Sequence, residues 1–254
     1  MNIQLTLAAR YLKGRKLRTT LTTLAIMFGV LVIFGMNTLL PAMTQAFQVN
    51  LMAATGQVDA TITLKTSAAF PASVVEQVAG VEGVRAAAGF IERTVNVMPD
   101  YYDADPNLPD AISALDLIGL EPSQANTVRA FLIQEGRMLT AEDTTSAVIS
   151  QSLADAVGVK LGGTMTLPAA NGETALTIVG LLPTRAMAGN EEVLVTLPQA
   201  QAMLDMIGEI NTVEANFDTL EEARRLEIEN NILAALGDTY QVGSLSSNSE
   251  LLNN

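Results

Sequence analysis

Residues 58–64 read VDATITL, and apolar and polar side chains alternate strictly along this stretch. Its apolar side chains fall on one face of an extended chain, which predicts a half-buried strand. A short helix is predicted next in PASVVEQVAG (71–80), because it opens with a proline and closes with a glycine. Residues 91–97, IERTVNV, alternate again. This part of the chain therefore predicts one strand–helix–strand unit.

A second unit of the same kind lies near the C-terminus. Residues 213–217, VEANF, alternate like a strand, and Thr219 and Glu222 have the spacing of a capping box at the start of a helix. Gly237 is placed to end that helix, and TYQVG (239–243) predicts a last strand. We expect the two units to pair into one sheet that carries their helices on one face.

The stretch between the two units has a different pattern. It opens with a loop rich in Asp and Pro, DYYDADPNLPD (100–110), and continues with short apolar runs between Gly and Pro turns. Strands are predicted at residues 112–120, 146–150, 163–168, 174–182 and 192–196, and helices at 152–158 and 198–208. The predicted fold is α+β, with a split α+β lobe made of residues 57–100 and 209–245 and an inserted β-rich lobe made of residues 101–208.

The N-terminal part of the chain has the composition of a membrane anchor. Residues 21–40 read LTTLAIMFGVLVIFGMNTLL, and a helix of this length spans roughly 30 Å, the thickness of the hydrocarbon core of a bilayer. Five basic side chains precede it: Arg10, Lys13, Arg15, Lys16 and Arg18. Within the run, Ala25 and Gly29 have the spacing that lets a second helix approach closely, although one such pair also occurs by chance.

The charges indicate which side of the membrane each part occupies. Residues 1–20 carry a formal charge of +5 and the rest of the chain carries −18, which together give the net charge of −13. Basic flanks stay on the cytoplasmic side, so we expect this chain to be a cell-membrane protein whose bulk lies outside the cytoplasm. A cleaved signal peptide is the alternative, but its apolar region usually has about 7–15 residues. The expected segments are a cytoplasmic start (1–18), a transmembrane helix (19–41), a stalk helix (42–56) and, after the lobes, a tail (246–254).

The composition and the spacing of motifs argue against catalysis. The chain has no Cys and no His, which excludes a thiol nucleophile, an imidazole base and a Ser–His–acid triad. Gly-rich nucleotide motifs are absent, and a calcium loop starting at Asp103 would have Leu108 where Gly is required. We predict no catalytic residues, no cofactor, no metal site and no nucleic-acid partner. An exported enzyme that uses carboxylates or a Ser–Lys pair is the lesser alternative.

Several stretches, taken in order, resemble one known family. The basic entry LKGRKLRTTLTTLAIMFGV (12–30) resembles the first transmembrane entry of MacB/FtsX-type permeases of ABC transporters. Residues 118–143, 147–167, 174–183 and 197–204 resemble successive blocks of that family's extracytoplasmic core domain. The residues that match the blocks are Gly119, Pro122, Gly136, Arg137, Val179 and Gly180. No single block is diagnostic, but their order is that of the family.

The resemblance implies a fold and a function. It implies a MacB-like periplasmic core domain with porter-like and sabre-like lobes, in a permease that forms a homo- or heterodimer and works with a cytoplasmic ABC ATPase. ATP-driven movement would then serve export, lipoprotein release or signalling. The family's C-terminal FtsX-like transmembrane region is absent from residues 1–254. A single-span, membrane-anchored binding or sensor module is the alternative, and Arg137 is expected to fix a turn by bonding to backbone carbonyls.

Overall fold

The structure is a computed structural model that describes residues 16–55, 58–99, 101–102, 112–184 and 189–244. The chain divides into two compact units, Met1–Ala54 and Thr55–Asn254, and each unit is described by itself. The predicted loop at 100–110, apart from residues 101–102, and the basic residues before Lys16 lie outside the described residues.

The described part of the first unit is one long helix, α2 (Lys16–Thr55), which is continuous through Pro41. Within it, Lys16–Met36 has a mean hydropathy of 2.0 and no buried side chains in the structure, so its length and composition suffice to cross a membrane. The hydroxyl groups of Thr20 and Thr22 donate hydrogen bonds to the carbonyls four residues earlier, which satisfies these polar groups within the helix.

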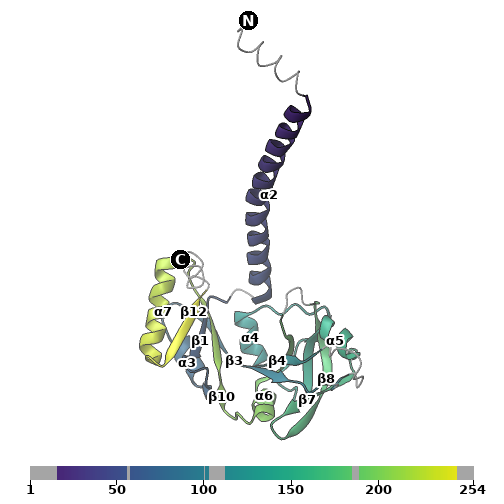
Figure 1. Cartoon of the computed structure of the whole chain (residues 1–254). Helices are drawn as coiled ribbons and strands as arrows, with labels where there is room; N and C mark the ends of the chain where they lie inside the picture. The colour runs from purple at the N-terminus through teal and green to yellow at the C-terminus, as the bar shows by residue number, and fades with distance from the viewer. Residues whose placement is uncertain (1–15, 56–57, 100, 103–111, 185–188, 245–254) are drawn as a thin grey trace. The chain divides into compact units, whose positions relative to one another are not determined.

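The second unit is built on a mixed sheet (Figure 1). The order of its described strands is β12-β1-β11-β3-β4-β9-β6-β8-β5, with β7 paired to β8, and β2 and β10 form a separate small sheet. The strands are β1 (Ala60–Leu64), β2 (Phe70–Pro71), β3 (Val84–Asn96), β4 (Ala114–Leu120), β5 (Glu135–Gly136), β6 (Ser146–Ser150), β7 (Thr164–Ala169), β8 (Gly172–Leu182), β9 (Glu191–Thr196), β10 (Glu209–Ile210), β11 (Thr212–Phe217) and β12 (Tyr240–Ser244). The helices of this unit are α3 (Val74–Ala79), α4 (Pro122–Val128), α5 (Gln151–Val157), α6 (Leu197–Leu204) and α7 (Glu222–Leu236).

The two predicted strand–helix–strand units pair as expected. β1 and β3 come from the first unit, β11 and β12 from the second, and all their pairings are antiparallel. Helices α3 and α7 bury Val78 and Ile232 in the same apolar cluster as Ile62 and Val213 of the strands. These shared apolar contacts place both helices on one face of the strands, because the apolar side chains of each strand point to that face.

The predicted capping box on α7 is wrong. The helix begins at Glu222, and Glu221 occupies the N-cap position without a side-chain cap. The Thr219 hydroxyl instead accepts a hydrogen bond from the Glu221 N–H at 3.1 Å, because it lies too far from the first turn to reach the N–H groups there. The predicted end of the helix is confirmed, since Gly237 follows Leu236 with φ of +91°.

One long strand joins the two ends of the chain to its middle. The first half of β3 pairs with β11 and its second half pairs with β4, and Phe90 faces both Thr212 and Leu120. Beyond β4 the sheet continues through a parallel pairing with β9 and a parallel pairing of β6 with β8. The two predicted lobes therefore share one continuous sheet, and the boundary drawn between them at residues 101–208 stays a prediction.

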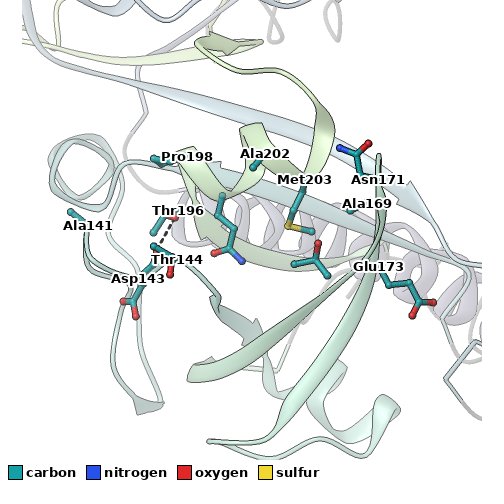
Figure 2. A pocket seen from close by; sticks show the side chains of 12 residues that line it. Ala141, Asp143, Thr144, Ala169, Asn171, Glu173, Thr196, Pro198, Ala202 and Met203 are labelled. Carbon is teal, nitrogen blue, oxygen red and sulfur yellow. Dashed lines mark hydrogen bonds between the residues drawn. The ribbon is translucent and has the colours of Figure 1, made fainter.

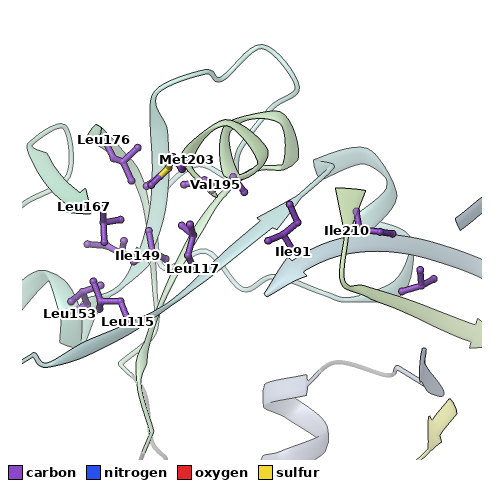
Figure 3. Packing of buried hydrophobic residues seen from close by; sticks show 14 of the residues in the cluster. Ile91, Leu115, Leu117, Ile149, Leu153, Leu167, Leu176, Val195, Met203 and Ile210 are labelled. Atoms are coloured by element: carbon purple, nitrogen blue, oxygen red, sulfur yellow. The ribbon is translucent and has the colours of Figure 1, made fainter. Parts of the chain in front are cut away.

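The sheet carries apolar clusters on two faces. The larger cluster joins the strands to α3, α5, α6 and α7, and Figure 3 shows side chains from its central part, among them Leu117 of β4 and Ile149 of β6. A second cluster contains Phe90, Ile118 and Leu194 and is covered by Ala125 and Val128 of α4. Helix α4 was not predicted, and it means that the helices do not all lie on one face of the sheet.

Candidate functional site

Two of the residues in the family blocks lie where β4 leads into α4. A Cβ atom built on Gly119 would lie closer than 3.0 Å to the Cβ atom of Ala200, so the absence of a side chain lets α6 pack tightly on β4. Pro122 is buried at the start of α4, where its missing N–H removes no helical hydrogen bond. Gly119 thus faces α6 and the larger apolar cluster, whereas Pro122 begins the helix that covers the second face of the sheet.

The other four family-block residues come together where β5 meets β8. Gly136 faces Gly180 across this pair of strands, and the Arg137 N–H donates to the Val179 carbonyl at 2.9 Å. A Cβ atom on Gly180 would collide with the Arg137 carbonyl, and one on Gly136 with the Val179 carbonyl. Gly136 also has φ of +79°, a region that other residues rarely adopt. The two glycines therefore permit a close approach of two backbones.

The Arg137 side chain is held by a carboxylate that the sequence analysis did not single out. Its guanidinium donates to both carboxylate oxygens of Asp143, at 2.7 and 2.8 Å, and to the Met138 carbonyl at 3.0 Å. Asp143 also accepts hydrogen bonds from the Thr140 N–H, the Thr140 hydroxyl and the Ser146 hydroxyl. The Arg137 guanidinium, with the bonds from Thr140 and Ser146, lowers the pKa of Asp143 far below the usual range despite partial burial.

A hollow of about 370 Å³ opens next to Asp143 (Figure 2). Helix α6 contributes Pro198 and Met203 to its lining, and the hairpin formed by β7 and β8 contributes Glu173. The hairpin is tied to α6 because the Ala170 N–H donates to the Met203 carbonyl at 2.7 Å. The residues that line the hollow are Ala141, Asp143, Thr144, Ala169, Asn171, Glu173, Thr174, Thr196, Pro198, Gln199, Ala202 and Met203, which include no base paired with a nucleophile.

A buried cluster of charges forms where α4 ends. Arg129 follows α4 directly, and its Nε donates to Glu214 Oε2 of β11 at 2.6 Å. Its Nη2 donates to the other oxygen of Glu214 and to Glu92 of β3, the latter at 2.9 Å. Burial acts to lower the pKa of Arg129, but the bonds to the two carboxylates outweigh it, so the pKa is raised and the guanidinium stays charged.

The sequence analysis did not single out this cluster. Arg129 and Glu214 are 85 positions apart, and neither is among the residues that match the family blocks. A second hollow of about 290 Å³ lies beside the cluster and is lined by Glu92, Arg93, Thr94, Asp116, Ile118, Arg129 and Glu192. Among the residues that the structure describes, no group of three or more acidic side chains is placed to hold a metal ion.

The candidate residues of the first unit are placed only in part. Lys16 and Arg18 lie exposed at the start of α2, while Arg10, Lys13 and Arg15 lie outside the described residues. Ala25 and Gly29 are one helical turn apart, and a Cβ atom on Gly29 would meet nothing within 4 Å. The structure thus leaves room for a second helix at Gly29.

Solved structures share this fold. The periplasmic region of MacB from Actinobacillus actinomycetemcomitans matches with a TM-score of 0.58 at 10% identity, over 80% of this chain and 96% of that one. The extracellular domain of the noncanonic ABC-type transporter YknZ from Gram-positive bacteria matches with a TM-score of 0.51 at 16% identity, over 74% and 99% of the two chains. No curated protein matches the sequence. At these identities the two likenesses show the fold alone, which is that of a MacB-like periplasmic domain.

The family follows from the sequence itself. The model of the MacB-like periplasmic core domain matches residues 19–243, and the chain belongs to this family. The family is a component of transporter permeases rather than a classical enzyme, and it implies an ATPase partner in general terms. The resemblance drawn from the blocks of sequence and the α+β fold class with an apolar N-terminal helix are both confirmed.

Proposed function

We propose that the chain is the N-terminal part of a permease subunit of the MacB/FtsX type. It couples ATP hydrolysis by a cytoplasmic partner to work outside the cytoplasm, which is export, lipoprotein release or signalling. The observation that carries this proposal is the single family match over residues 19–243, which takes in both the apolar helix and the folded body. A body of this family preceded by a spanning helix is the arrangement that such a permease requires.

The expected topology rests on hydropathy and charge. The side chains of Leu21, Leu24, Phe28 and Leu31 are each at least 58% exposed on α2, which is costly in water and favourable in lipid. The basic cluster lies at the start of that helix and the acidic body follows it. Positive flanks remain in the cytoplasm, so the body is placed outside the cell membrane in this proposal.

The body suits the transmission of movement better than chemistry. Its sheet runs without interruption from β12 to β5, and most of the apolar side chains of its strands lie in two packed clusters. A densely packed sheet transmits strain with little deformation. The division into a split lobe and an inserted lobe would then describe two parts of one stiff body, joined at Phe90.

The orientation is tested with single cysteines, since the natural chain has none. We expect a membrane-impermeant maleimide to label Gln124→Cys, at an exposed position of α4, in intact spheroplasts. Lys16→Cys, at the exposed start of α2, should be labelled only after the membrane is disrupted. The cysteine-free parent is the control. Labelling of Lys16→Cys from outside, or recovery of the chain in the soluble fraction, would contradict the proposed topology.

The partner is tested on the chain purified in mild detergent from its native membranes. We expect a nucleotide-binding subunit to copurify in fixed ratio and to show vanadate-inhibited ATPase activity. If no ATPase copurifies while the isolated chain binds an extracytoplasmic ligand, the single-span binding or sensor module becomes the better assignment.

The proposed homo- or heterodimer is tested within α2. Mild oxidation should cross-link Gly29→Cys to a second α2 helix if the faces with Ala25 and Gly29 meet. Leu31→Cys lies about 200° around the helix and is the matched control. Equal cross-linking at both positions would show that this face is not an interface.

A further inference from the structure

Arg129 links three segments that are far apart in the sequence. Its forked guanidinium bonds both oxygens of Glu214 in β11 and one oxygen of Glu92 in β3. Its charged carbon also lies 4.8 Å from the centre of the Phe90 ring, in the geometry of a cation–π contact. One side chain at the end of α4 thus holds two strands of the sheet at once.

Stability alone does not account for this ion pair. The side chain of Arg129 is 17% exposed and that of Glu214 is 6% exposed, so both charges have lost most of their hydration. Apolar residues of similar volume often stabilise a buried site as well as an ion pair does. A guanidinium that bonds both oxygens of one carboxylate instead fixes the orientation of the two side chains, because the two bonds form together at only one relative orientation of the groups.

Strand β11 makes a second contact with the same end of α4. The buried side-chain amide of Asn216 donates to the Val128 carbonyl at 3.1 Å and also reaches the Thr127 carbonyl. Asn216 and Glu214 are two positions apart in β11, so their side chains point to the same face of the sheet. Strand β11 is therefore hydrogen-bonded both to the last carbonyls of α4 and to Arg129, the first residue after this helix.

We propose that Arg129 is a positioning residue that fixes the end of α4 to β11, so that the middle of the chain follows a displacement of β11. This inference rests on the proposed function, because it names the contact through which movement passes inside the body. Strand β11 pairs with β1, the first strand after α2 in the sequence, while α4 lies in the predicted inserted lobe. Movement received at β1 thus reaches α4 through β11 and the Arg129 fork.

The test separates the position of α4 from the stability of the body. Spin labels at Asn126→Cys in α4 and Asn230→Cys in α7 occupy exposed positions on opposite sides of the strands. Their distance distribution is measured by pulsed electron paramagnetic resonance in the full chain in nanodiscs. Glu214→Gln leaves a buried charge without its main partner, so we expect a Tm lower by roughly 6–15 °C and a broader distribution.

The decisive variant is Arg129→Met combined with Glu214→Leu, which removes both charges but keeps the volume. We expect its Tm to return close to that of the parent while the distance distribution stays broad. A restored Tm with an unchanged, narrow distribution would overturn the proposal, because packing alone would then position α4. The matched control is Arg224→Gln with Glu227→Gln, an exposed ion pair within α7, which should change neither measurement.

The outcome does not depend on the partner ATPase. The distances are measured on the chain alone, so a failure to copurify an ATPase would reject the proposed function and leave the positioning role intact. A narrow distribution in the double variant, together with a copurified ATPase, would reject the positioning role only.

Discussion

Gly119 of β4 and Ala200 of α6 approach so closely that a single added methyl group would not fit between them. Ala200 is fully buried in the larger cluster. After Ala200, the side chain of Ile91 in the neighbouring strand is the nearest group to such a methyl. The strand and the helix can therefore pack at this distance only because position 119 has no side chain.

Gly119→Ala should lower the stability of the body by about 1–3 kcal/mol, because α6 must move away from β4 or distort. Urea denaturation of the full chain in nanodiscs, followed by circular dichroism, measures the loss. Adding Ala200→Gly should recover part of it, since the second methyl is then removed. Gly243→Ala is the control, because its Cβ atom would have only ordinary contact, at 3.8 Å. Equal losses at both glycines would contradict this account.

The Arg137–Asp143 pair makes stability depend on pH. The pKa of Asp143 is lowered in the folded protein, chiefly by its bond to Arg137, so the ionised carboxylate stabilises the fold above the ordinary aspartate pKa of about 4. That contribution is lost as the pH falls through the lower pKa of the folded state. We expect Asp143→Asn to cost about 2 kcal/mol at pH 7 and progressively less below pH 4 or so.

Urea denaturation of parent and variant from neutral to acidic pH measures this difference. Asp155→Asn is the matched control, because Asp155 is exposed and accepts one hydrogen bond from Gln151. A stability difference between the parent and Asp143→Asn that stays constant from pH 7 to about pH 3 would show that the ionised form of Asp143 is not what stabilises the turn.

Ser150 joins two elements through one hydroxyl group. It accepts a hydrogen bond from the Leu153 N–H as the N-cap of α5 and donates one to the carboxylate of Glu191. The Ser152 hydroxyl also donates to that of Ser150, at 3.2 Å. Ser150→Ala removes these bonds at a buried position and should cost about 1–2 kcal/mol. Hydrogen exchange of the first turn of α5 measures the local effect. Ser123→Ala, at an exposed serine whose hydroxyl donates to nearby Glu121, should leave exchange in α5 unchanged, and faster exchange in that control would point to a general effect.

The strands near both ends of the chain were predictable because each has one face of apolar side chains. The alternation in residues 58–64 and 213–217 reports that face directly, and the structure contains β1 and β11 at these positions. The alternation did not indicate what covers the other face of residues 213–217. Glu214 lies on that face and is buried, because α4 covers that side of the strand.

Helix α4 was missed for a physical reason. Its seven residues, PSQANTV, contain only three that are buried, Pro122, Ala125 and Val128. They make about two helical turns, which is shorter than the window of about 11–18 residues that reveals a helical period. Its stability comes from packing on the sheet and from the bonds of Arg129 to Glu214 and of Asn216 to Val128, which join residues more than 80 positions apart in the sequence. Periodicity within a short window cannot report contacts of that range.

The close approach of β5 and β8 gives the last prediction. Both obstacles there are backbone oxygens, the Arg137 carbonyl facing Gly180 and the Val179 carbonyl facing Gly136. Backbone atoms cannot rotate away as a side chain can, so Gly180→Ala should cost at least as much as Gly119→Ala, about 3 kcal/mol. It should also break the bond between the Arg137 N–H and the Val179 carbonyl. Hydrogen exchange at the Arg137 amide measures this, and slow exchange retained in Gly180→Ala would show that the two strands tolerate a wider separation. The control is Val179→Ala, which shortens a side chain beside the contact and leaves the backbones free to meet.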